Sequence, residues 1–146
     1  MSSRPSSSKL DVLSFLVGRW SLRGRSVGAL EDNISGTSEI VWSPDHEFLE
    51  QRSVLRLGTD ETHALEIVGY RPDSEELPAW VFASGAHESL RYTWRVEGDQ
   101  LIHEGLGATF RGTVSPDRRT IRGAWKSNGP SPGPGSDYSV EMIRTD

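Results

Sequence analysis

Short segments in which apolar and polar residues alternate cover most of the chain after Gly18. Alternation with a period of two is typical of β-strands that bury one face and leave the other in water. Clusters of Gly, Pro, Asn, Asp and Ser separate the segments, and these residue types favour turns. The pattern predicts ten strands, over residues 19–27, 34–43, 46–57, 62–71, 79–84, 89–96, 100–105, 108–114, 120–126 and 137–144.

The connections between these segments are mostly two to six residues long. Connections this short join antiparallel neighbours, so consecutive strands form a meander. A meander of this length leaves two unpaired edges unless it closes on itself. We therefore expect an all-β protein, a single closed antiparallel up-and-down β-barrel of about ten strands, in one domain over residues 9–146.

The residues before the first strand form two parts. Residues 1–8 are rich in serine, and we expect a disordered N-terminal tail. Leu10, Leu13 and Leu16 then follow a partly helical spacing, which predicts a short α-helix or 3₁₀ turn before Gly18. The apolar side chains of this helix would most economically close one end of the barrel.

The apolar face of each strand predicts which side chains point inward. In the third segment, Gln51 and Ser53 fall on the same face as several leucines. In the fourth, Leu65 and Ile67 place His63 inside. In the fifth, Trp80 and Phe82 form the apolar face, which we expect to line the interior.

A barrel of ten strands tends to be too wide for side chains alone to fill. Aromatic rings inside it can stack on a planar ligand, and a few polar groups can orient that ligand. The candidate ligand-binding residues are aromatic or polar and predicted to point inward: Trp42, Gln51, Ser53, His63, Trp80, Tyr92, Trp94, His103, Trp125 and Tyr138. Alternatively, the aromatic side chains pack as core and the polar ones bond to one another or to water.

The expected function is non-enzymatic binding of a small, mostly apolar or aromatic molecule. One alternative is an isomerase or cyclase that uses His63 or His103 as general base. No nucleophile or carboxylate pair stands at a diagnostic spacing, so we assign no catalytic residue. A further alternative is a filled barrel that acts as a structural or interaction protein.

Charge and residue composition indicate which kinds of partner the protein can bind. A net charge of −5 argues against general nucleic-acid binding, which needs a basic field. With no cysteine and four histidines on separate segments, we expect no metal site. No window is long and apolar enough to span a membrane, and no apolar leader follows the N-terminal serines, so we expect a cytoplasmic protein. An edge strand, or the side of the barrel that exposes Phe48, is a candidate homodimer surface.

The sequence Gly18-Arg19-Trp20 at the start of the first strand resembles the opening of lipocalin-like, or calycin-like, barrels. Residues 46–52 and 65–71 are similar to the third and fourth strands of small cytoplasmic lipocalin-like bacterial families of unknown function. The resemblance implies a barrel fold in which Arg144 packs over Trp20 through a cation–π contact. Ten strands exceed the eight of secreted lipocalins.

Gly18, Trp20 and, with a shifted spacing, Gly24 also resemble more distantly the opening of the ten-stranded nitrobindin family. That family ligates haem through a histidine near its C-terminus. The last histidine here is His103, and the final strand has none. We therefore expect no haem or other cofactor, and no Soret band from the purified protein.

The connection between the ninth and tenth strands, residues 127–136, is long and rich in proline and glycine. Because links alternate between the two ends of a meander, we expect this loop at the open mouth, opposite the helix. It is a candidate gate for ligand entry, and a tolerated insertion is the alternative.

Overall fold

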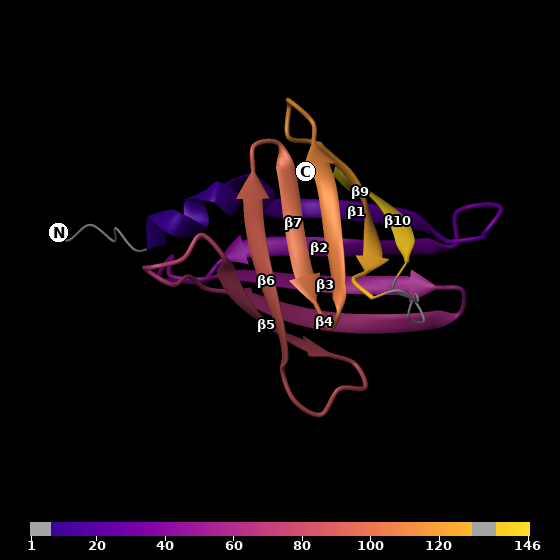
Figure 1. Cartoon of the computed structure of the whole chain (residues 1–146), viewed down its shortest axis with the longest axis horizontal. Coiled ribbons are helices and arrows are strands. Elements are labelled where there is room, and N and C mark those ends of the chain that lie inside the picture. Colours follow the sequence, from indigo (N-terminus) through magenta and orange to yellow (C-terminus); the bar gives the residue numbers. More distant parts are fainter. Residues whose placement is uncertain (1–6, 130–136) are drawn as a thin grey trace.

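The computed structural model describes residues 7–129 and 137–146 and shows a closed β-barrel that follows one 3₁₀ helix (Figure 1). The predicted fold class is confirmed, and each strand boundary lies within three residues of its expected position. The elements are η1 (Ser7–Leu16), β1 (Gly18–Ser26), β2 (Ile34–Trp42), β3 (Leu49–Leu57), β4 (Asp60–Val68), β5 (Leu77–Ala83), β6 (Leu90–Glu97), β7 (Gln100–Gly105), β8 (Ala108–Val114), β9 (Thr120–Ser127) and β10 (Tyr138–Arg144).

Every strand pairs antiparallel with its neighbours in sequence, and β10 pairs with β1 to close the barrel. The closing register runs from Trp20 opposite Arg144 to Ser26 opposite Tyr138. Each of the ten described strands thus has a partner on both sides, which is how a long meander satisfies its backbone groups. The fold is compatible with that of calycin-like barrels.

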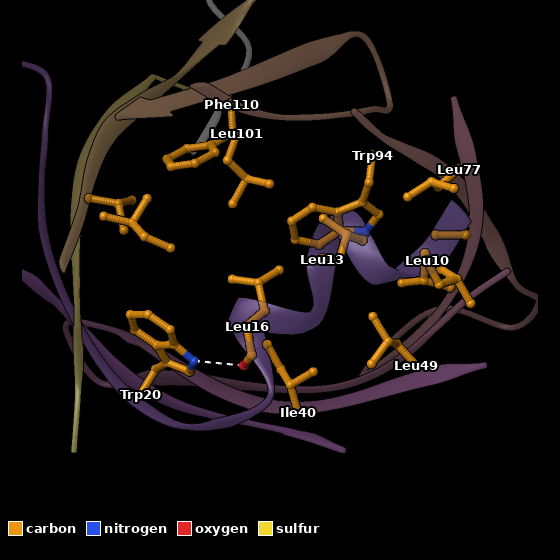
Figure 2. Close-up of a cluster of buried hydrophobic side chains, with 14 residues drawn as sticks. Leu10, Leu13, Leu16, Trp20, Ile40, Leu49, Leu77, Trp94, Leu101 and Phe110 are labelled. Atoms are coloured by element: carbon orange, nitrogen blue, oxygen red, sulfur yellow. Dashed lines mark hydrogen bonds between the residues drawn. The ribbon is translucent and has the colours of Figure 1, made fainter. Parts of the chain in front are cut away.

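The helix η1 lies at one end of the barrel and contributes to its core (Figure 1). Leu10 and Leu13 are fully buried, and Figure 2 shows them with Leu16 among side chains of the strands. The indole Nε1 of Trp20 donates a hydrogen bond to the carbonyl oxygen of Leu16, at 2.9 Å. The helix and the first strand are thus joined by both apolar packing and a buried hydrogen bond.

Arg144, on the last strand, contacts both η1 and β1 at the same end of the barrel. Its guanidinium lies over the ring of Trp20, 4.6 Å from the ring centroid, so the expected cation–π contact is confirmed. The guanidinium also donates hydrogen bonds to the carbonyl oxygens of Phe15 and, at 2.8 Å, of Val17. One side chain from the last strand therefore holds the end of η1 and the start of β1.

Two expectations concern segments that are largely outside the described residues. The N-terminal tail was expected over residues 1–8, and the described chain begins at Ser7, the first residue of η1. The candidate gate was expected over 127–136, of which 130–136 lie outside the described residues.

The expected faces of β4 and β5 are wrong. The His63 side chain is 62% exposed and Phe82 is 48% exposed, so both lie outside the barrel. Trp80 also faces outward, where the guanidinium of Arg91 lies 4.8 Å from its ring centroid. The reason is that these two strands carry apolar residues on both faces, so the alternation does not distinguish inside from outside. The larger aromatic and branched side chains occupy the outer face.

The faces of β4 and β5 that point inward in the structure carry a different set of side chains from the one expected. Ala79 and Val81 of β5 are buried, as is Val68 of β4. Glu66, between the outward-facing Leu65 and Ile67, points inward and is only 4% exposed. Within the described residues, no helix is long and apolar enough to cross a membrane.

Candidate functional site

The barrel interior contains a cavity of about 150 Å³. An apolar cavity of this volume in a protein interior can hold one benzene ring. The wall is mostly apolar and aromatic, with a minority of polar side chains; it comprises Leu16, Leu22, Ser38, Gln51, Ser53, Val54, Leu55, Trp94, Leu101, His103, Phe110, Trp125, Tyr138 and Met142.

Small side chains on neighbouring strands leave room for this cavity. Ser38 on β2 pairs in register with Ser53 on β3, which pairs with Ala64 on β4, which in turn pairs with Ala83 on β5. Directly opposite residues on one face of a sheet have their Cβ atoms about 5 Å apart. Because the side chains in this row are small, they leave unfilled space along one side of the barrel interior.

The predicted site residues fall into four groups. Gln51, Ser53, Trp94, His103, Trp125 and Tyr138 line the cavity. Tyr92 lies beside it, with its ring centroid 5.0 Å from that of His103. Trp42 stacks on His46, with centroids 3.9 Å apart, away from the cavity wall. His63 and Trp80 lie on the outer surface and are not part of the site.

Glu66 is the centre of a buried polar cluster behind the cavity wall. One carboxylate oxygen, Oε2, accepts hydrogen bonds from Nε1 of Trp94 at 2.8 Å and from Nε2 of His103 at 2.9 Å. The other oxygen, Oε1, accepts one from Nε2 of Gln51 at 3.2 Å. An ionised carboxylate is purely an acceptor, and three donors converge on it here. The cluster thus satisfies a charge that burial would otherwise penalise.

The imidazole of His103 is fixed on several sides. Its ring is stacked on that of Trp94, with centroids 3.7 Å apart and an interplanar angle of 15°. The ring of Trp125 lies 5.2 Å away at 60°, and that of Tyr92 lies on a further side. With Nε2 held by Glu66, the imidazole has little freedom to rotate.

The other ring nitrogen of His103, Nδ1, has no hydrogen-bond partner among the described residues. No buried side-chain nitrogen or oxygen in this part of the chain lacks a partner, so Nδ1 is not sealed off. His103 lines the cavity, and Nδ1 is its ring nitrogen without a partner among the described residues. In the neutral imidazole, a proton on Nε2 leaves a lone pair on Nδ1.

Two tyrosines lie at the cavity, Tyr138 in its wall and Tyr92 beside it. Burial, with a smaller contribution from Tyr92, raises the pKa of Tyr138 to about 12. Burial, with a smaller contribution from Glu66, also raises the pKa of Tyr92. Both phenols are therefore neutral at ordinary pH, and Tyr138 offers a hydroxyl to the cavity that it lines.

The sequence reasoning missed Glu66. A signal was present, because Glu66 is the single charged residue in the stretch Ala64-Leu65-Glu66-Ile67-Val68. Assigning the face of β4 from its larger side chains placed Glu66 outside, where a charge needs no explanation. Its register partner Gln51, correctly expected inside, would have pointed to the opposite assignment.

Among the described residues, no group of three or more His, Cys, Asp or Glu side chains is arranged to hold a metal ion. In comparisons with known proteins, no family model matches the chain and no curated protein matches it. Function is therefore inferred from the geometry of the cavity.

Proposed function

We propose that the barrel binds a small, mostly apolar or aromatic molecule in its interior and does not transform it. The observation that carries this proposal is the cavity of about 150 Å³ with an apolar and aromatic wall. Trp125, Phe110 and Leu101 offer apolar surface, and Gln51, His103 and Tyr138 offer a few polar groups. This combination is typical of small-molecule sites.

The test is titration with benzene, followed by NMR, in the parent protein and in two variants. Ser53→Leu fills the cavity from the row of small side chains, and Thr37→Leu places a leucine at an outward position on β2. Benzene should bind saturably to the parent and to Thr37→Leu. Affinity for Ser53→Leu should fall by about tenfold or more, because a filled site loses its contacts. Equal affinities in all three would contradict the proposal.

Native mass spectrometry of the purified protein identifies the natural ligand if it is retained. The proposal predicts a bound mass of one small compound, and adding that compound back should produce no new product. Turnover of the retained compound would instead support an enzyme.

A second candidate function is proton transfer on a bound molecule, as in an isomerase or cyclase. The observation in its favour is the contact between Glu66 and His103, since a carboxylate that holds an imidazole supports a general base. His103, not His63, is the relevant histidine. A solvent-deuterium exchange assay on the retained compound would detect proton abstraction, and His103→Phe should abolish it.

We also propose that the chain is a cytoplasmic member of the lipocalin-like, or calycin-like, barrels. The opening Gly18-Arg19-Trp20 and the contact of Arg144 with Trp20 support this relationship. Cell fractionation with an antibody to the protein tests the location, and recovery in the membrane or secreted fraction would contradict it.

A further inference from the structure

His103 is a polar residue of the cavity wall, and its ring nitrogen Nδ1 has no hydrogen-bond partner among the described residues. We propose that the cavity selects a neutral single-ring compound that carries a hydrogen-bond donor, which is bound by Nδ1 of His103. This inference rests on the proposed function, because it names the class of ligand that the same cavity would take.

The tautomer of His103 follows from its surroundings. Nε2 lies 2.9 Å from Oε2 of Glu66, which can only accept when ionised. Trp94 also donates to that oxygen, and an indole N–H can never accept. A neutral imidazole in this place therefore carries its proton on Nε2 and leaves a lone pair on Nδ1.

Glu66 acts through His103 and does not touch the ligand. It is 4% exposed and is absent from the cavity wall, which Gln51, Trp94 and His103 form in front of it. Glu66 is therefore a positioning residue: it holds the imidazole by one nitrogen and so determines what the other nitrogen can bind.

The size and charge of the ligand follow from the wall. A cavity of about 150 Å³ matches one aromatic ring. Among the described residues, no lysine or arginine side chain lines this cavity, so an anionic ligand would find no counter-charge from them, with Glu66 close behind the wall. A cation would have to leave water for a largely apolar pocket. A neutral ring with an N–H or O–H group fits both the apolar wall and Nδ1.

The test uses two pairs of probes matched in size, measured by NMR titration at pH 8, where histidine is ordinarily neutral. Pyrrole has a ring N–H donor that furan lacks, and pyridine has a ring acceptor that benzene lacks. The parent should bind pyrrole about threefold to tenfold more tightly than furan, which corresponds to one net hydrogen bond. The hydroxyl of Tyr138 can donate to pyridine, so any preference for pyridine over benzene should persist in His103→Phe, whereas the preference for pyrrole over furan should not.

Three variants and one surface control separate the roles of His103 and Glu66. His103→Phe should bind furan and remove the advantage of pyrrole, whereas the matched surface change His63→Phe should leave it intact. Glu66→Leu removes the acceptor at Nε2, so the preference for pyrrole over furan should collapse. Glu66→Gln should restore it, because the amide oxygen can still accept from Nε2 while Gln51 turns its own amide oxygen toward the new NH₂ group.

The tautomer itself provides a measurement that needs no variant. In the long-range ¹H–¹⁵N spectrum of the parent protein, Nδ1 of His103 should resonate as an unprotonated nitrogen and Nε2 as a protonated one. The reverse assignment would overturn the proposal, even if Glu66→Leu does not fold.

Failure of this inference and failure of the proposed function give different results. If furan and benzene bind in the cavity but pyrrole binds no more tightly than furan, the ligand class is wrong and the binding function stands. If none of the four probes binds, the binding function itself is contradicted. If Glu66→Gln loses the preference for pyrrole over furan as fully as Glu66→Leu does, then Glu66 does not act by accepting a hydrogen bond from Nε2 of His103.

Discussion

Two carboxylate–histidine pairs in this protein have similar geometry and very different surroundings. Glu66 and His103 meet inside the barrel at 2.9 Å, with the two side chains 5% and 12% exposed. Glu61 and His63 meet on the surface at 2.7 Å, with the side chains 42% and 62% exposed. Hydrogen bonds to a buried carboxylate cannot be replaced by water, so we expect only the inner pair to matter for stability.

We predict that Glu66→Ala lowers the free energy of unfolding by about 3 kcal/mol, because it leaves the N–H groups of Trp94 and His103 buried without an acceptor. Glu61→Ala should change it very little. Urea unfolding of both variants beside the parent measures the difference. Equal effects of the two substitutions would show that the inner cluster is not the stabilising one.

Tyr138 makes stability depend on pH in the alkaline range. Burial raises the pKa of Tyr138 in the folded protein to about 12, from an ordinary value of 10.0. Above pH 10 the unfolded chain therefore loses this proton before the folded chain does, and the free energy of unfolding falls as pH rises toward 12. Below pH 10 the phenol is neutral in both states and contributes no slope.

We predict that the Tyr138→Phe variant loses part of this alkaline slope. Denaturant unfolding at a series of pH values from 9 to about 12 measures it, and absorbance titration of the tyrosines should show one fewer late-ionising phenol. Identical slopes in the parent and the variant would contradict the account of Tyr138.

At the scale of the elements, the end of η1 depends on Arg144. Its guanidinium bonds to two carbonyl oxygens, of Phe15 and Val17, and covers the ring of Trp20. A lysine has a single nitrogen and cannot reproduce this fork. We predict that Arg144→Lys costs about 1–3 kcal/mol in urea unfolding.

The control is Arg23→Lys, at a side chain that is 62% exposed and pairs with Glu141 on the surface. It should leave the free energy of unfolding nearly unchanged. If Arg144→Lys were equally neutral, the attachment of η1 would rest on the apolar contacts of Leu10, Leu13 and Leu16 alone.

The alternation of apolar and polar residues assigns the inward face of some strands and not of others. In β2, Ile34, Gly36, Ser38 and Ile40 are buried and the residues between them are exposed, so the pattern alone assigns the faces. In β4 and β5 both faces carry apolar side chains, and only the pairing with β3 and β6 decides between them. The barrel could therefore be predicted from the sequence, whereas the inward position of Glu66 follows only once β4 is paired with β3, which places Glu66 opposite Gln51.

At the scale of the whole molecule, the outer surface of β4 and β5 is unusually apolar. The outer apolar face comprises Phe48, Leu65, Ile67, Trp80 and Phe82, in which Ile67 pairs with Trp80 and Leu65 with Phe82. Phe48 and Phe82 are 43% and 48% exposed. Since the barrel is closed and offers no strand edge, this face is the surface on which we propose that two copies associate.

We predict that the protein sediments as a dimer and that Phe82→Asp converts it to a monomer, because two copies would bury the added charge. Leu30→Asp, at a connection residue that is 96% exposed, should leave the dimer intact. Analytical ultracentrifugation of the three proteins measures the outcome, and a monomeric parent at high concentration would exclude the proposed association.

The central claim is that the interior of the barrel receives a single-ring ligand beside His103, and Met142 offers the most direct test. The chain has two methionines, and Met142 lines the cavity. In protein labelled with ¹³C at the methionine methyl groups, titration with pyrrole should shift the Met142 signal saturably, with intermolecular NOEs between this methyl group and the pyrrole ring. Saturable binding of pyrrole that leaves the Met142 signal unmoved would contradict the account.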